Sequence, residues 1–198
     1  MKKRIILIFA CLLIAASMLT ACGTPEENFK KATQNFDNFT VEIEEESEGE
    51  KSLTVIVKTD NTLKFITCTQ SASTTVYIKK DGEKYRLYDF VKKGWSSTGY
   101  SETELFGDVQ STESGVIGVL KQSFFDDYTV AKNEYIMKDS ALASYSKYFG
   151  KYETLESFRF KLNGDHFEQA TAVTQYGTYR HQYTYKFKDF GKSKVDVE

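Results

Sequence analysis

Residues 179–190 read YRHQYTYKFKDF and carry the clearest period-two pattern in the chain. The odd-numbered positions put Tyr179, His181, Tyr183, Tyr185 and Phe187 on one side of a strand, and the even-numbered positions are mostly polar or basic. Such alternation predicts a strand with one face in the core and the other in water. This closing strand therefore predicts a sheet with an aromatic inner face.

Shorter runs of the same kind fill most of the chain. Two strands before the closing one are expected at 158–162 and 167–176, with turns at Asn163-Gly164 and Gly177, and another strand at 128–138. Earlier strands, spaced about ten residues apart, predict a consecutive antiparallel meander with tight turns at Asp60-Asn61 and Asp81-Gly82. These earlier strands are expected at 39–44, 53–58, 63–68, 75–79, 85–90 and just after Gly94-Trp95.

Helical spacing of apolar residues interrupts the strands in three places. Thr24-Pro25-Glu26-Glu27 is typical of a capped helix start and predicts a helix over 25–37. A second helix is expected over 114–126, a weaker one over 102–110, and a stripe of helical spacing runs from Leu142 to Tyr152. The apolar stripes of the first, second and last of these are Phe29, Ala32, Phe36; Val116, Leu120, Phe124; and Leu142, Tyr145, Phe149, Tyr152. Helices inserted among antiparallel strands predict an α+β domain.

The first 21 residues have the pattern of a signal peptide. Lys2-Lys3-Arg4 precede an apolar stretch over 5–19, which is short for a membrane span. Leu19-Thr20-Ala21-Cys22 resembles the bacterial lipobox. That resemblance implies cleavage before Cys22, a diacylglyceryl group on its thiol, further fatty acylation such as palmitate, and anchoring on the extracytoplasmic face of the cell membrane. We therefore expect a signal peptide at 1–21 and one domain at 22–198, with 22–24 as a short tether.

The composition fits one globular domain: 40% of residues are hydrophobic, 27% are charged and the formal net charge is −2. Without residues 1–21 the chain keeps 23 basic and 28 acidic side chains, so nucleic acid is not an expected partner. Cys11 would leave with the signal and Cys22 would be acylated, which leaves Cys68 without an internal disulfide partner. We expect Cys68 to be a small buried hydrophobe, the alternative being a reactive thiol.

No local pattern of catalysis, cofactor binding or metal binding is evident. His166 and His181 are the two histidines and neither has partners at ligand spacing, and the sequence contains no nucleophile elbow, phosphate loop or dinucleotide fingerprint. We therefore expect no enzyme, no catalytic residue, no cofactor and no metal. Six glutamates between Glu42 and Glu50 are expected to be a solvated strand face, with a calcium or cationic-partner site as the alternative.

The aromatic face allows two interpretations. Its residues either fill the core beneath the helices or line a cavity for an amphipathic guest, with His181 as a buried polar contact or simply a satisfied core residue. The ligand-lining candidates are Trp95, Tyr179, His181, Tyr183, Tyr185 and Phe187.

The order of elements resembles the LolA/LolB-like superfamily. The resemblance uses the lipobox, the N-terminal helix, the hairpin YIKKDG at 77–82, Gly94-Trp95, and the long closing strands that end in FKDFG at 187–191. It implies a strongly curved antiparallel sheet, an incomplete barrel whose concave face is covered by the helices, and members that carry lipids or lipoproteins. We expect a membrane-anchored, non-enzymatic lipoprotein that binds a lipid or lipid-modified ligand; the alternative is a cell-envelope protein interaction module with a filled core.

Overall fold

The computed structural model describes residues 23–34, 36, 38–59, 62–68 (backbone), 73–101, 104–105 and 115–195. The described part contains three α-helices, α2 (Pro25–Gln34), α4 (Gly115–Gln122) and α5 (Asp139–Tyr145). Its strands are β1 (Phe39–Ser47), β2 (Glu50–Lys58), β3 (Thr62–Cys68), β4 (Ser73–Asp81), β5 (Lys84–Asp89), β6 (Gly94–Trp95), β7 (Tyr128–Ala131), β8 (Glu134–Met137), β9 (Thr154–Asn163), β10 (His166–Tyr176) and β11 (Tyr179–Lys188).

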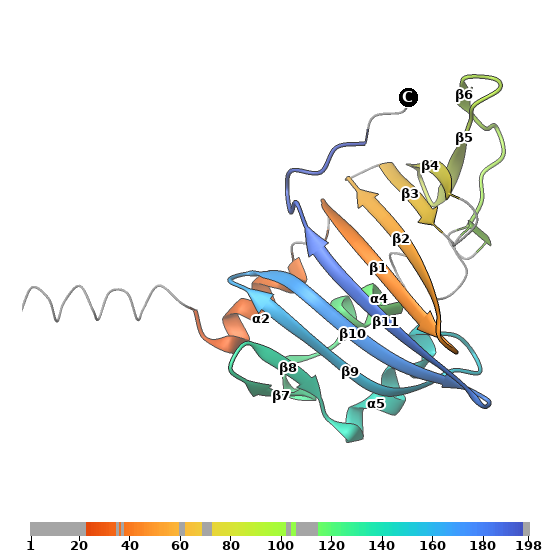
Figure 1. Ribbon diagram of the computed structural model, residues 1–198. Helices are drawn as coiled ribbons and strands as arrows, with labels where there is room; N and C mark the ends of the chain where they lie inside the picture. The colour runs from red at the N-terminus through yellow and green to blue at the C-terminus, as the bar shows by residue number, and fades with distance from the viewer. Residues whose placement is uncertain are drawn as a thin grey trace, which may run out of the picture.

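All eleven strands belong to one antiparallel sheet in the order β6-β5-β4-β3-β2-β1-β11-β10-β9-β8-β7. Two meanders, β1–β6 and β7–β11, meet where the first strand pairs with the last (Figure 1). The sheet is open, with β6 and β7 as its edges. The expected α+β class and the consecutive meander of the first six strands are confirmed, as are the hairpin turns at Asp81-Gly82, Asn163-Gly164 and Gly177.

The β1–β11 pairing aligns two apolar rows. Val41 lies opposite Phe187 and Ile43 opposite Tyr185, so both strands present their odd-numbered residues to the same side, here called the inner face. The even-numbered residues of β1 and β11 lie on the outer face. A shift of one residue would move every one of these side chains to the other face, so burial of the aromatic row fixes the register.

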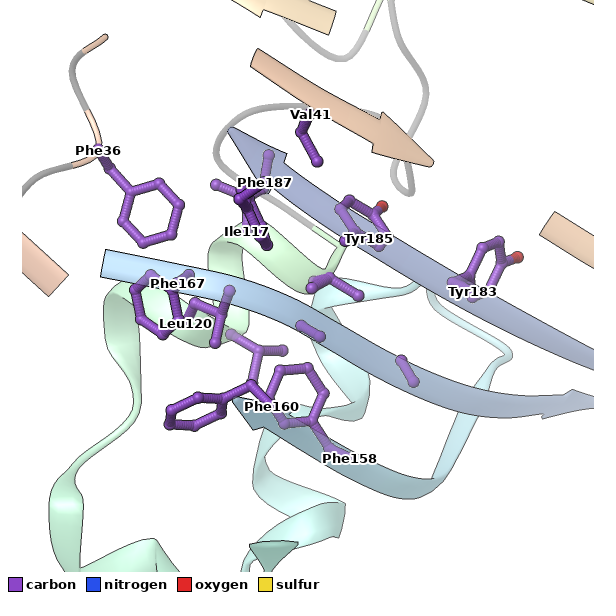
Figure 2. Packing of buried hydrophobic residues seen from close by; sticks show 14 of the residues in the cluster. Phe36, Val41, Ile117, Leu120, Phe158, Phe160, Phe167, Tyr183, Tyr185 and Phe187 are labelled. Carbon is purple, nitrogen blue, oxygen red and sulfur yellow. The ribbon is translucent and has the colours of Figure 1, made fainter. Parts of the chain in front are cut away.

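Helices cover the inner face at β9 and β10. Phe29 of α2 stacks on Phe160 of β9. Phe36, two residues after the end of α2, packs on Phe167 of β10 with ring centroids 5.0 Å apart. Figure 2 shows Ile117 and Leu120 of α4 directed toward the aromatic side chains of β9, β10 and β11. Each large apolar side chain buried in this way stabilises the fold by about 1.5–3 kcal/mol.

The start of α2 has the expected capping box. The Glu27 backbone N–H donates to Thr24 Oγ1 at 3.2 Å, and the Thr24 N–H donates to Glu27 Oε2 at 2.9 Å. The helix ends at Gln34, earlier than the expected residue 37.

Three local expectations need correction. Residues 128–138 form the β7–β8 hairpin rather than one strand, with Lys132 at the turn in a left-handed conformation (φ 59°). Helix α4 stops at Gln122, so Phe124 leaves the apolar stripe and is 71% exposed. Helix α5 ends at Tyr145 and a 3-10 turn follows; Phe149 is buried and Tyr152 is exposed. The Asp60-Asn61 turn and most of the 102–110 helix lie outside the described residues.

Candidate ligand-binding face

The inner side of β11 changes from apolar and buried to polar and open along its length. Phe187, Tyr185 and Tyr183 belong to the buried core, with Tyr185 only 1% exposed. His181 is half-buried and Tyr179 is 48% exposed. The structure therefore brings five of the six candidate residues onto one strand face, arranged as a gradient toward the β10–β11 turn.

The buried tyrosine hydroxyls on this face have partners within the protein. Tyr185 hydrogen-bonds the backbone of Val116 in α4, and Tyr183 hydrogen-bonds the Thr174 side chain of β10. The Thr174 hydroxyl in turn donates to Glu153 Oε2 at 2.7 Å. Burial is the main cause that raises the pKa of both tyrosines far above the ordinary value, and the Glu45 carboxylate raises both further.

A histidine–glutamate pair lies at the exposed end of the aromatic row. His181 Nδ1 lies 3.3 Å from Glu45 Oε1, and the His181 and Tyr183 rings are nearly parallel with centroids 6.2 Å apart. Glu45 is a site residue that the sequence interpretation missed. Its position in the sequence could have indicated this role, because Glu45 continues the odd-numbered apolar row of Phe39, Val41 and Ile43 on β1.

Trp95 lies apart from the other candidates. It is in the edge strand β6, which five strands separate from β11. Leu87 of β5 pairs with Ile78 of β4, which is on the inner face, so Leu87 is on the inner face too. The next residue, Tyr88, is therefore on the outer face, and so is its register partner Trp95. Trp95 packs against Tyr88, with ring centroids 5.4 Å apart.

Glu42, Glu44 and Glu46 of the 42–50 segment lie on the outer face of β1. Glu44 accepts from Lys186 Nζ at 2.6 Å and Glu42 accepts from Lys188 Nζ, both across the β1–β11 pair. The hydrogen bond with Glu42 is the main cause that raises the pKa of Lys188. Within the described ranges no three His, Cys, Asp or Glu side chains are grouped so as to hold a metal ion.

A shallow hollow of about 380 Å³ lies at the other end of β11. His166 stacks on Phe190 at its rim, with ring centroids 4.7 Å apart, and Phe187 reaches it from the inner face. Lys188 and Lys192 contribute basic groups, and Glu168 and Asp189 contribute acidic ones. The mixed charge and open shape do not select a ligand class.

Cys22 and the lipobox fall outside the described residues, as does the side chain of Cys68. No helix in the described part of the chain is long and apolar enough to cross a membrane.

No protein-family model and no curated protein matches the chain in sequence. Among solved structures, LprF from Mycobacterium bovis is similar with a TM-score of 0.40 and 6% sequence identity, over 88% of this chain and 95% of that one. A likeness at this level carries no conclusion about ligand or activity.

Proposed function

We propose that this protein is a non-enzymatic lipoprotein that is anchored by a diacylglyceryl group on Cys22 and binds an amphipathic ligand at the open end of the aromatic face. The Leu19–Cys22 lipobox pattern supports the anchor and its extracytoplasmic side. Two or more acyl chains on one residue hold a protein stably at a bilayer, whereas a single chain holds it only marginally.

The burial of α4 supports a strongly curved sheet, an incomplete barrel. Six consecutive residues of α4, from Gly115 to Leu120, are buried, so every side of this helix is covered. β10 and β11 cover one side, and α2 and the 3-10 turn Ser146–Tyr148 also contact this helix. A sheet that curves around α4 would bring the apolar inner positions of the first meander, such as Ile56 and Ile78, toward its other side.

The observation that carries the ligand proposal is the gradient along β11. An amphipathic molecule has an apolar body and a polar head, and this strand offers both environments in sequence. The apolar body would enter beside Tyr183, while the head would lie against His181 and Glu45. Tyrosine suits this boundary because its ring is apolar and its hydroxyl is polar.

A second candidate, an envelope protein interaction module with a filled core, is favoured by the packing under α2. Phe29, Tyr135 and Phe160 stack closely there, and the Tyr135 hydroxyl donates to the Pro25 carbonyl at 2.8 Å. Hydroxyls that are already paired within the protein need no ligand.

Native mass spectrometry of the full chain, extracted from its own membrane, separates the two candidates. A non-covalent lipid or other amphiphile that co-purifies reproducibly is expected, and Glu45→Gln should reduce its occupancy severalfold. Glu46→Gln is the matched control, because Glu46 is the next residue on β1 but lies on the outer face. A protein that is empty and takes up no labelled lipid contradicts the binding proposal and leaves the interaction module.

A further inference from the structure

The turn between β5 and β6 exposes apolar side chains beside basic ones. Residues 90–93 connect the two strands, and among them Phe90 is 49% exposed and Val91 93% exposed. Lys92 and Lys93 follow directly and are also exposed. This segment, Phe90 to Lys93, is called the β5–β6 tip below.

The β5–β6 tip is held in a defined conformation. Asp89 Oδ1 accepts hydrogen bonds from the backbone N–H groups of Val91 (2.9 Å) and Lys92 (3.0 Å), an Asx-type turn. The Phe90 ring packs edge-on against Tyr88 at 5.2 Å, and Tyr88 packs against Trp95. The exposed apolar side chains of the tip therefore rest on packed aromatic rings and hydrogen-bonded backbone.

The position of the tip is opposite to that of the N-terminal helix. Figure 1 shows α2 at one end of the sheet and the β5–β6 hairpin at the other. A chain attached to a bilayer near α2 and touching it again at the β5–β6 tip would lie along the membrane surface.

We propose that the β5–β6 tip contacts an anionic bilayer, with Phe90 and Val91 entering the interfacial region and Lys92 and Lys93 on lipid phosphates. Aliphatic lysine stems lie along apolar surface while their ammonium groups reach the headgroups, and aromatic rings favour the same depth. Each basic residue near an anionic leaflet adds attraction, and the two positive charges of Lys92 and Lys93 exceed the single negative charge of Asp89.

The size of the patch favours a bilayer over a protein partner. A stable protein interface buries more than about 1,000 Å², which two apolar side chains cannot supply. A bilayer needs no such area here, because the proposed lipid on Cys22 already keeps the domain near it and makes the second contact intramolecular in effect. This proposal rests on the proposed function in one respect, that the lipid on Cys22 keeps the domain near the bilayer.

Trp95 reports on this contact directly, because it is the only tryptophan of the chain and packs at the base of the tip. The full chain purified from membranes is mixed with vesicles of phosphatidylcholine and phosphatidylglycerol, or of phosphatidylcholine alone, with brominated acyl chains as quenchers. We expect a blue shift and quenching of Trp95 emission, stronger in the anionic vesicles.

Matched variants identify the residues involved. Phe90→Ser/Val91→Ser should abolish the quenching, Lys92→Glu/Lys93→Glu should remove the preference for anionic vesicles, and Phe124→Ser, at another exposed phenylalanine, should change neither. Val91→Asp tests the same contact with minimal risk to folding, since this side chain is almost fully exposed. It should lower the quenching in the same direction.

Flotation of the vesicles separates this proposal from the anchor. Protein that floats while Trp95 stays unquenched at saturating vesicle concentration contradicts the tip contact and leaves the anchor intact. Protein that does not float but shows quenching contradicts the anchor and supports the tip. Quenching that persists in Phe90→Ser/Val91→Ser overturns the assignment of these two residues.

Discussion

Phe29 of α2 stacks on Phe160 of β9, with ring centroids 5.8 Å apart and ring planes 28° apart. The same Phe29 ring contacts Phe125, Tyr128 and Tyr135, so one helical side chain joins the first helix to the β7–β8 hairpin and to β9. Since α2 begins three residues after Cys22, this contact fixes the end of the sheet that lies next to the proposed anchor.

Phe29→Ala should therefore be among the most destabilising single changes. Removal of a buried phenylalanine leaves a cavity and costs about 3–5 kcal/mol in the free energy of unfolding. Chemical denaturation followed by circular dichroism measures this. Phe124→Ala is the control, with an expected change within about 0.5 kcal/mol because Phe124 is exposed. Equal losses in the two variants would contradict the central place of Phe29 in the core.

Asp127 joins two segments through one carboxylate. Its Oδ2 accepts from the Phe124 backbone N–H at 2.8 Å and from the Tyr145 hydroxyl at 2.6 Å, which ties α5 to the 3-10 turn after α4. Tyr145→Phe should cost about 1.5–3 kcal/mol, as expected for a hydrogen bond to a charged group. A double-mutant cycle with Asp127→Asn should give a coupling energy above about 0.5 kcal/mol. Asp126→Asn, at the exposed neighbouring carboxylate, should be nearly neutral; additive losses at 127 and 145 would argue against the contact.

The local alternation of apolar and polar residues was sufficient to predict much of the fold, and β11 illustrates the physical reason. Alternation of Tyr183, Tyr185 and Phe187 with basic residues leaves one arrangement that buries the rings, so strand, face and burial follow from sequence. The β1–β11 pairing did not follow, because local alternation does not encode which distant strand is the partner. The β7–β8 turn was missed because Lys132 takes a left-handed conformation that usually requires glycine or asparagine.

The candidate site was only partly predictable for the same reason. His181, Tyr183 and Tyr185 share a face by strand period alone, but Trp95 could be placed relative to them only through the order of seven strands from β6 to β11. Glu45 was hidden in a run of glutamates that looked uniformly solvated. Its odd-numbered position separates it from Glu44 and Glu46, and this difference becomes meaningful once the register with β11 is known.

Alkaline solution should destabilise the protein through its buried tyrosines. Burial raises the pKa of Tyr128 and of Tyr185 far above the ordinary value, while the same groups in the unfolded chain ionise near pH 10. Below about pH 10 both states hold the phenolic proton and stability is unaffected. Above it the unfolded chain releases protons that the folded chain keeps, so stability falls by up to about 1.4 kcal/mol per pH unit for each such group.

Tyrosinate absorbance after a pH jump measures this effect. We expect a slow phase that coincides with the loss of circular dichroism, because Tyr128 and Tyr185 ionise only when the protein unfolds. Tyr185→Phe should reduce the absorbance change of the slow phase by the amount that corresponds to the ionisation of one tyrosine. Complete ionisation within the mixing time, with the fold retained, would contradict the burial of these two hydroxyls.

Cys22→Ala should release the protein from the membrane. The variant lacks the thiol that would carry the diacylglyceryl group. Cell fractionation with immunodetection measures the membrane-bound share, and mass spectrometry of the wild-type chain should show an N-terminal acylated Cys22. Cys11→Ala is the matched control, because Cys11 lies within the apolar stretch of the expected signal peptide and should leave with it. A wild-type Cys22 without acyl groups in the mass spectrum, or membrane retention of a Cys22→Ala chain that has lost residues 1–21, would refute the lipobox assignment. Equal release by Cys11→Ala would show that export, rather than acylation, had failed.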